Sequence, residues 1–387
     1  MELFDEPSSA SPEAAGANPG KKSAPPTAAA PAPKRARSKA PRANAQTMAQ
    51  KQREISVSEF FVKNRHLLGF DNPRKALLTA VRECVDNSLD ACSEAGILPT
   101  LRIHVEQLGE DRYRISVEDN GPGIVRKQIP RIFGKLLYGS NYHTLKQQRG
   151  QQGIGVSAAG MYGQLTTGKP VHIMSRTGPR TSAHLFEITV DTKRNEPLVL
   201  KDEVTDWETK QGTKVEIELE AVYKKGRRSV DDYVEQTALA NPHTEIFYTP
   251  PKQETIHYPR AVTEVPEEPK EIQPHPYGVE LGRLMRMLQD THARNLSSAL
   301  KGDFSRVTDK VVAALCEVAK LRPNARPRKL SHGDVERLHK AFPQVKIMSP
   351  PTNCLSPIGE EAMVAGLQKR FEADYYEAVT RPPAVYR

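Results

Sequence analysis

The sequence predicts a mixed α+β protein, and three observations lead to this fold class. A long amphipathic helix is bounded by Asn72, a preferred N-cap residue, and by Gly96 just past its end. Two runs, Leu101–Leu108 and Arg112–Asp119, alternate apolar and polar residues around a short polar turn, which is typical of a β-hairpin. Residues 279–342 then follow helical patterns with short turns. Antiparallel strands and separate groups of helices in one chain indicate the α+β class.

The elements between these landmarks follow in order along the chain. Pro73 suits the first position of the long helix, whose apolar residues recur at helical spacing as Leu77, Leu78, Val81, Val85, Leu89 and Cys92. A short amphipathic segment at 55–61 precedes it. Later patterns predict helices at Lys127–Leu137, from the glycine-rich stretch 149–155 through Met161, and at 229–240, and strands at 171–175, 184–191 and 213–219.

Composition narrows the class of protein before any motif is considered. The 387 residues carry 56 Lys and Arg against 47 Asp and Glu, a formal net charge of +9. No apolar run approaches the roughly 20 residues that span a bilayer. The amino terminus, Met1–Asp5, has neither the basic nor the apolar region of a secretory signal. Four cysteines without a Cys-x-x-Cys pair argue against a zinc ribbon or disulfide scaffold. We expect a soluble intracellular protein.

The charge is unevenly distributed, and its distribution suggests a division into segments. Residues 1–53 are rich in Ala and Pro and carry a net +5, residues 54–274 carry −2, residues 275–346 carry +7 and residues 347–387 carry −1. The first segment has too little apolar surface to fold, so we expect a disordered basic tail. It is either a solubilising tail or a non-specific nucleic-acid arm. Prolines crowd residues 251–274, which we interpret as a linker.

Polar residues on the long helix form the first candidate site. Glu83, Asp86, Asn87 and Asp90 are spaced so that they share one helical face. An acidic stripe of this kind is also typical of a face that only contacts solvent, and the helix alone does not decide between the two interpretations.

Three loops supply the other candidate pieces. Asp119 ends a predicted strand and is followed by Gly121 and Gly123, where the alternative is a plain Asx-type turn. The stretch Arg149–Ser157 is glycine-rich and precedes a helix, so its backbone N–H groups could meet a phosphate, although a flexible loop fits equally well. It is neither a Walker A loop nor a dinucleotide fingerprint. Gly212 and Thr213 begin a later strand and carry no meaning alone.

Taken together and in this order, the four pieces resemble the Bergerat (GHKL) ATPases, a family shared by gyrase, MutL, histidine kinases and a heat-shock chaperone. Four stretches resemble the B subunits of topoisomerase VI more closely: Ile55–Phe70, Arg82–Ala91, Arg149–Ala159 and Pro274–Val279. The resemblance covers residues 55–387. It implies a Bergerat-type α/β sandwich with an N-terminal strap at 54–250, a helix-two-turn-helix domain at 275–346 and the beginning of a transducer domain at 347–387.

The resemblance also implies roles for individual residues. Glu83 corresponds to the general base that polarises the attacking water, and Asn87 to the ligand of Mg²⁺. Asp119, helped by Thr213, corresponds to the acceptor for the adenine amino group. The remaining nucleotide-binding positions that the family pattern implies are Gly121, Gly123, Ser140, Asn141, Gly150, Gln151, Gln152, Gly153, Ile154, Gly155, Val156 and Ser157.

The function implied is that of an ATP-binding B subunit of a type IIB DNA topoisomerase. ATP would close two copies into a gate around duplex DNA, while an A-type subunit carrying the cleavage tyrosine makes a transient double-strand break. The family's transducer supplies a lysine to the terminal phosphate, and this chain stops at Arg387, where that domain would be starting. A truncated or a naturally short form is therefore expected. The alternatives are a MutL-like nucleotide-dependent DNA clamp and an inactive DNA-binding fragment.

The resemblance and the charge together point to one DNA-facing segment. Residues 275–346 hold 14 basic side chains against 7 acidic ones. Arg322, Arg326, Arg328 and Lys329 cluster in a predicted loop between helices, where they could contact phosphates of a duplex backbone. The alternative is a basic domain with a structural role only.

Overall fold

The computed structural model describes residues 48–49, 55–139, 145–149 and 154–383. Contacts separate Met1–Glu54 from a compact body, Ile55–Arg387, and the elements that follow all belong to the compact body. The expected tail at 1–53 lies almost entirely outside the described residues. Among the helices that the structure describes, none is both long enough and apolar enough to cross a membrane.

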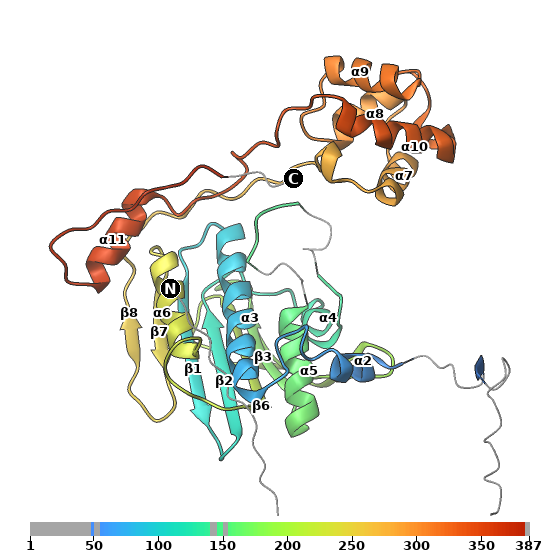
Figure 1. The fold of residues 1–387 in the computed structure, drawn as a ribbon. Coiled ribbons are helices and arrows are strands. Elements are labelled where there is room, and N and C mark those ends of the chain that lie inside the picture. Colours follow the sequence, from blue (N-terminus) through green and yellow to red (C-terminus); the bar gives the residue numbers. More distant parts are fainter. Residues whose placement is uncertain (1–47, 50–54, 140–144, 150–153, 384–387) are drawn as a thin grey trace, which may run out of the picture. The chain divides into compact units, whose positions relative to one another are not determined.

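One eight-stranded sheet organises the first part of this body (Figure 1). Its strand order is β5-β4-β3-β6-β2-β1-β7-β8, and every neighbouring pair is antiparallel except β1 with β7. The strands are β1 (Thr100–Gln107), β2 (Arg112–Asp119), β3 (Val171–Arg176), β4 (Ala183–Asp191), β5 (Glu196–Thr205), β6 (Gly212–Glu220), β7 (Glu245–Thr249) and β8 (Ile256–Tyr258).

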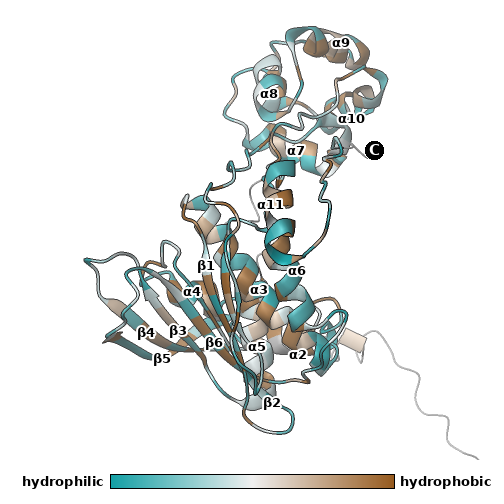
Figure 2. Cartoon of the chain, turned by 90° about the vertical axis from the view of Figure 1, so that its left-hand side faces the viewer, coloured by the Kyte–Doolittle hydropathy of each residue, from teal (hydrophilic) through white to brown (hydrophobic). Residues whose placement is uncertain are grey.

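Helices cover one face of this sheet, as Figure 2 shows. They are α2 (Val57–Lys63), α3 (Pro73–Glu94), α4 (Ile129–Gly134), α5 (Gly155–Thr167) and α6 (Val230–Ala240). Strand β2 explains the arrangement, because every second residue from Tyr113 to Asp119 is buried and the residues between them are less so. The buried faces of the sheet, α3 and α5 join in one hydrophobic core. A sheet with one covered face places the ends of β2 and β6 directly beneath α3.

Most predicted elements are confirmed, including the helix capped by Asn72, whose Oδ1 accepts the Lys75 N–H at 3.0 Å. The hairpin is confirmed with Leu101 opposite Asp119. The helix predicted at Lys127–Leu137 is wrong in extent, since α4 has only six residues. The chain becomes extended at Lys135 and turns left-handed at Leu137, with φ +63°. Ile129, Phe133 and Leu136 are buried, but Leu137 is exposed, so neither the helix nor the buried face reaches the predicted end.

Strand β5 has no counterpart in the sequence prediction. It is one of the two edge strands of the sheet and is largely exposed, so it lacks the alternation that marks a half-buried strand. The region expected to be a linker, 251–274, contributes β8, which pairs with β7. Pairing of this kind depends on a partner strand and is invisible in local composition.

Residues 279–347 form a second hydrophobic core of their own. It gathers α7 (Leu281–Asp290), α8 (Leu296–Asp303), α9 (Asp309–Ala319) and α10 (His332–Ala341), which together make up the helical region. Asn295 and Ser331 cap α8 and α10 by accepting backbone N–H groups at 2.8 and 3.2 Å. Helix α11 (Glu360–Arg370) comes later and packs on α6, where Arg370 donates to the Glu235 carbonyl at 3.0 Å.

Candidate nucleotide site

The polar residues on the predicted acidic face of α3 differ in how deeply they are buried. Asp86 and Glu83 are half-buried, whereas Asn87 is exposed. Burial, with a smaller contribution from repulsion by Asp86, raises the pKa of Glu83, and Arg82 acts in the opposite direction. Burial also raises the pKa of Asp86, although its carboxylate accepts the Tyr233 hydroxyl at 3.0 Å. The acidic face is therefore only partly open to solvent.

The Glu83 carboxylate lies against the first residue of α5. A side-chain carbon added at Gly155 would lie 1.6 Å from Glu83 Oε2, so only glycine permits this approach. Among the described residues, Glu83 makes no hydrogen bond and no ion pair. It is therefore a carboxylate with raised pKa, placed at the N-terminus of a 13-residue helix and available to a ligand.

Asp119 is the most completely buried carboxylate of the site, with 6% of its surface exposed. Its Oδ1 accepts the backbone N–H of Gly121 at 2.9 Å and of Thr213 at 3.2 Å. Its Oδ2 accepts the Ser88 hydroxyl at 2.8 Å. Burial raises the pKa of Asp119 while these three hydrogen bonds oppose the shift. The carboxylate is fixed in orientation, and one oxygen retains an unused lone pair.

The loops beneath Asp119 approach one another closely. Gly212 has φ +142°, and a side-chain carbon there would lie 2.0 Å from the Asp119 carbonyl, so no other residue fits. Gly123 lies against the Arg176 carbonyl in the same way. Ser175 of β3 links the loop after β2 to the start of β6. Its Oγ accepts the Ile124 N–H at 2.8 Å and lies 3.2 Å from Thr213 Oγ1. Thr213 is thus part of a buried network and does not stand alone.

The glycine-rich stretch is only partly described. Ser140, Asn141 and Gly150–Gly153 lie outside the described residues. Ile154 precedes α5 and Gly155 begins it, while the side chains of Val156 and Ser157 are buried. The Ser157 hydroxyl donates to the Ile154 carbonyl at 3.0 Å. These four residues can therefore meet an anion through the backbone N–H groups of the first helical turn.

Arg149 holds the start of this stretch in place. Its backbone N–H and its Nη1 donate to Asp90 at 3.2 and 2.8 Å, and its Nη2 donates to Asn241 at 2.8 Å. The residues just before Arg149 contact other parts of the chain. The Leu145 carbonyl accepts the Ile272 N–H at 3.0 Å, and the Gln147 side chain accepts the Ser356 N–H at 2.9 Å. Residues 145–149 therefore connect α3 to two segments that flank the helical region.

Comparisons with known proteins show which families this chain is similar to. Residues 72–222 match the family of histidine kinase-, DNA gyrase B-, and HSP90-like ATPases, and residues 350–387 match the topoisomerase VI B subunit transducer. The chain is 48% identical over 343 residues to the B subunit of a type 2 DNA topoisomerase 6 of Methanococcoides burtonii, and the match covers 88% of this chain and 55% of that protein. For the protein of the same name from Archaeoglobus fulgidus, the identity is 45% over 340 residues, covering 88% and 56%.

The chain belongs to the topoisomerase VI B-subunit family. It spans a little over half the length of the curated relatives that it matches. Among solved structures, a topoisomerase IV ATP-binding domain of Francisella tularensis in complex with a small-molecule inhibitor is 17% identical with a TM-score of 0.36, covering 52% of this chain and 53% of that one. The match of residues 72–222 to the ATPase family places an ATPase-type domain in this part of the chain.

Sequence reasoning assigned no role to three residues of this candidate site. Ser88 orients Asp119, Ser175 links the strand ends, and Arg149 anchors the glycine-rich stretch. Ser88 directly follows Asn87, and a serine on the boundary between the apolar and acidic faces of α3 was the available signal. No local pattern identifies Ser175 or the partner of Arg149, since both contacts join residues that are far apart in the sequence.

Proposed function

We propose that this chain is the nucleotide-dependent part of a type IIB topoisomerase B subunit. In this proposal it binds ATP with Mg²⁺, two copies close into a gate, and an A-type subunit cuts and reseals the duplex that the gate controls. Membership of the family and the ATPase-type domain support the proposal. The observation that carries it is the placement of two carboxylates. Asp119 is held by the backbone N–H groups of Gly121 and Thr213 and by the Ser88 hydroxyl, and Glu83 lies against Gly155 at the start of α5.

Asp119 has the geometry to recognise an adenine amino group. A carboxylate offers about four lone pairs, and Oδ1 already accepts two backbone N–H groups. Among the described residues Oδ2 accepts only the Ser88 hydroxyl, so its second lone pair would be free to accept from a ligand. We therefore assign recognition of the amine to Oδ2, with Gly121, Gly123 and Thr213 shaping the pocket around the base. The Gly121 bond is itself the contact of an Asx-type turn, and the bonds from Ser88 and Thr213 are additional to it.

Glu83 has the environment of a general base. Its raised pKa places it nearer to neutrality than an ordinary glutamate, which improves proton acceptance at physiological pH. Its closeness to Gly155 places it beside the helix terminus that would hold the phosphates. In this proposal Glu83 orients and polarises the water that attacks the terminal phosphate.

Asn87 is the proposed protein ligand of Mg²⁺. It is exposed and lies one helical turn from Glu83. Among the described residues no group of three or more His, Cys, Asp or Glu side chains could hold a metal ion by itself. That fits an ion which takes one protein oxygen and completes its shell with phosphate oxygens and water. When bound, the ion would neutralise phosphate charge.

The phosphates would lie along the glycine-rich stretch. Ile154, Gly155, Val156 and Ser157 would contribute backbone N–H groups of the first turn of α5. Ser140, Asn141, Gly150, Gln151, Gln152 and Gly153 complete the proposed cradle on the family pattern. The links from residues 145–149 to Ile272 and Ser356 give nucleotide binding a physical route to the rest of the chain.

The proposed DNA contact lies on the helical region. Arg322, Arg326 and Lys329 are exposed, and among the described residues they form no ion pair or side-chain hydrogen bond. Arg328 differs, because its Nη2 donates to the Thr291 carbonyl at 3.0 Å. Free cations on a rigid helical scaffold are suited to phosphate contact, and a purely structural role would leave them without a purpose.

Replacement of Glu83 by alanine tests the enzymatic part of the proposal. ATP hydrolysis should fall by about 10²- to 10⁴-fold, the usual contribution of a general base, while nucleotide affinity stays within about threefold. The matched control is Glu94→Ala, an exposed glutamate on the same helix, which should leave turnover unchanged. Hydrolysis is best measured in the presence of an A-type subunit.

The same experiment separates the alternatives. Retained turnover in Glu83→Ala would refute its role as the base. Co-purification with an A-type subunit favours the topoisomerase, and its absence in a chain that still hydrolyses ATP favours a MutL-like clamp. Failure of the unaltered chain to bind ATP would leave only the DNA-binding fragment.

A further inference from the structure

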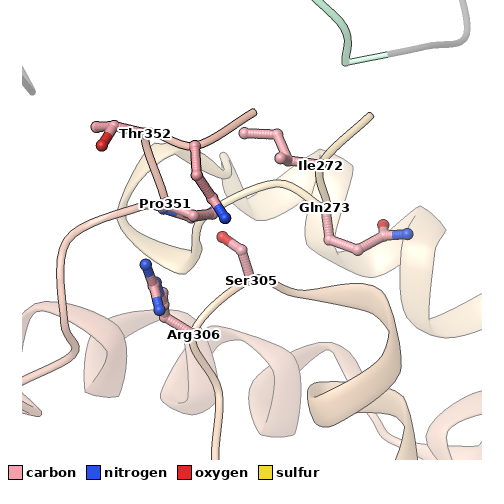
Figure 3. A pocket seen from close by; sticks show the side chains of 7 residues that line it. Ile272, Gln273, Ser305, Arg306, Pro351 and Thr352 are labelled. Atoms are coloured by element: carbon pink, nitrogen blue, oxygen red, sulfur yellow. The ribbon is translucent and has the colours of Figure 1, made fainter. Parts of the chain in front are cut away.

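A hollow of about 500 Å³ lies at the edge of the helical region, between the loop from α8 to α9 and the two extended segments that connect this region to the rest (Figure 3). It is lined by Ile272, Gln273, Ser305, Arg306, Pro351, Thr352 and Asn353. We propose that this hollow binds a phosphodiester group of duplex DNA, so that the connecting segments share the DNA contact with the helices. The inference rests on the proposed DNA-binding role of the helical region.

Backbone hydrogen bonds fix the three walls of the hollow relative to one another. The Ser305 N–H donates to the Pro274 carbonyl at 3.1 Å, which holds the α8–α9 loop against the incoming segment. The Lys270 N–H donates to the Cys354 carbonyl at 3.0 Å, which joins the incoming and outgoing segments. A ligand would therefore meet side chains that are already positioned and would not have to order a loose loop.

Ser305 is the first indication of a missing partner. Its Oγ is buried and has no hydrogen-bond partner among the described residues. A buried hydroxyl without a partner costs stability, so native proteins rarely keep one without a use. In Figure 3 this hydroxyl points toward the segment that carries Pro351 and Thr352, across the hollow.

Arg306 is the second indication. Its backbone is left-handed, with φ +61°, a conformation that costs free energy for any residue with a Cβ. Its side chain is exposed, and within the described part of the chain it forms no ion pair or hydrogen bond. Figure 3 shows the guanidinium rising beside Ser305 toward Pro351. The strained turn thus places a free cation and a free hydroxyl at one edge of the hollow.

The chemistry of the lining favours a phosphodiester. It contains one guanidinium, hydroxyls from Ser305 and Thr352, an Asn and a Gln, and no acidic side chain. These are the residue types that contact DNA phosphates without reading bases. The neighbouring helical region carries 14 basic and 7 acidic residues, which favours a polyanion over a small metabolite. An acidic peptide is the other possible occupant, and binding of polyglutamate distinguishes it.

Two substitutions in the full chain test the site by opposite signatures. Arg306→Gln removes one phosphate neutralisation, so the slope of log affinity against log salt should become less steep by about 0.9 for a linear duplex. Ser305→Ala removes a hydrogen bond without changing charge, so affinity should fall about two- to tenfold at every salt concentration with an unchanged slope. Its melting temperature should stay the same or rise, since an unpartnered buried hydroxyl is removed. If Ser305 had only a structural role, the substitution would lower both the duplex affinity and the melting temperature.

The matched control is Arg180→Gln, which removes one exposed cation from the turn between β3 and β4 and should change neither slope nor affinity. If both hollow variants bind duplex as Arg180→Gln does, the inference is overturned. If that happens while neutralising Arg322, Arg326 and Lys329 still weakens binding, the proposed DNA role stands and only this site is lost. Loss of polyglutamate binding without loss of duplex binding would assign the hollow to an acidic peptide, and failure of the unaltered chain to bind duplex would remove both proposals.

Discussion

The nucleotide domain, residues 72–222, and the helical region differ in how their charged side chains are exposed to water. Around α3, carboxylates are withdrawn from water, and burial raises the pKa of Glu83, Asp86 and Asp119. On the helical region, Arg322 and Arg326 are exposed and unpaired among the described residues. A buried carboxylate held by backbone N–H groups distinguishes one chemical group from another by geometry. Exposed cations attract any nearby negative charge and do not distinguish one anionic group from another.

This difference predicts how each region should respond to change. A single atom replaced in the nucleotide domain should alter which ligand is bound, because the hydrogen-bonding pattern is fixed. A cation removed from the helical region should alter how strongly binding depends on salt, with little effect on the identity of the ligand. The two regions have separate hydrophobic cores, so each set of changes should stay local.

The largest expected effect on ligand binding is that of Asp119→Asn. Oδ1 must keep accepting the N–H groups of Gly121 and Thr213, so the new amide nitrogen would take the place of Oδ2. It would then face the adenine amine donor to donor, and ATP affinity should fall about 100-fold. Inosine triphosphate, whose 6-oxo group accepts a hydrogen bond, should bind the variant better than ATP does.

Nucleotide titration by fluorescence or calorimetry measures this reversal. Asp111→Asn, in the exposed turn between β1 and β2, is the control and should bind ATP as the unaltered chain does. Equal loss of affinity for both nucleotides would mean that Asp119 supports the fold of the pocket without reading the base.

The next effect concerns the helical region. Joint replacement of Arg322, Arg326 and Lys329 by glutamine should make the salt slope of duplex binding less steep by up to about 2.7, or about 0.9 for each phosphate that is no longer neutralised. ATP affinity should not change. Binding is measured by titration of a labelled duplex at several salt concentrations.

A control that removes the same amount of charge tests whether position matters. Arg180, Lys193 and Arg194 are exposed and lie on the nucleotide domain, in the turns that flank β4. Their joint replacement by glutamine should leave the slope nearly unchanged. Identical slopes for both triple variants would reduce the helical region to a structural role.

The smallest effect concerns stability and pH. Because the folded state raises the pKa of Glu83, its contribution to stability is fully present below its unfolded pKa and is lost as pH rises through the folded value. Glu83→Gln does not titrate. Its melting temperature should therefore match that of the unaltered chain near pH 4 and exceed it at pH 8.

Glu218 provides a control of opposite sign. Burial acts against its ionisation, but Arg114 at 2.8 Å and Arg112 at 3.3 Å together lower the pKa of Glu218. Its stabilising contribution is present above its unfolded pKa and is lost as pH falls. Glu218→Gln should thus be less stable than the unaltered chain at pH 8 and approach it in acid. If the melting temperatures of both variants changed with pH in the same direction relative to the unaltered chain, a raised pKa of Glu83 would be contradicted.

Much of the fold could be predicted because its signals are local. The cap at Asn72, the alternation along β1 and β2 and the spacing of Glu83, Asn87 and Asp90 depend on residues a few positions apart. Strand β5 could not be predicted, since an exposed edge strand is defined by its partner β4 and its own residues show little alternation. The short α4 was overestimated for a related reason, because Gly134 packs against Pro197 of β5 and the helix stops there.

The sequence alone determined the materials of this protein: a helix with an acidic face, a strand ending in Asp119, a glycine-rich stretch and a basic region downstream. Periodicity and charge are properties of neighbours along the chain. Only the tertiary structure decided that Ser88 orients Asp119, that Arg149 is anchored on Asp90 and Asn241, and that Ser305 and Arg306 share a hollow with Thr352. The physical reason is that hydrogen bonds and burial depend on distance in space, which local sequence patterns do not specify.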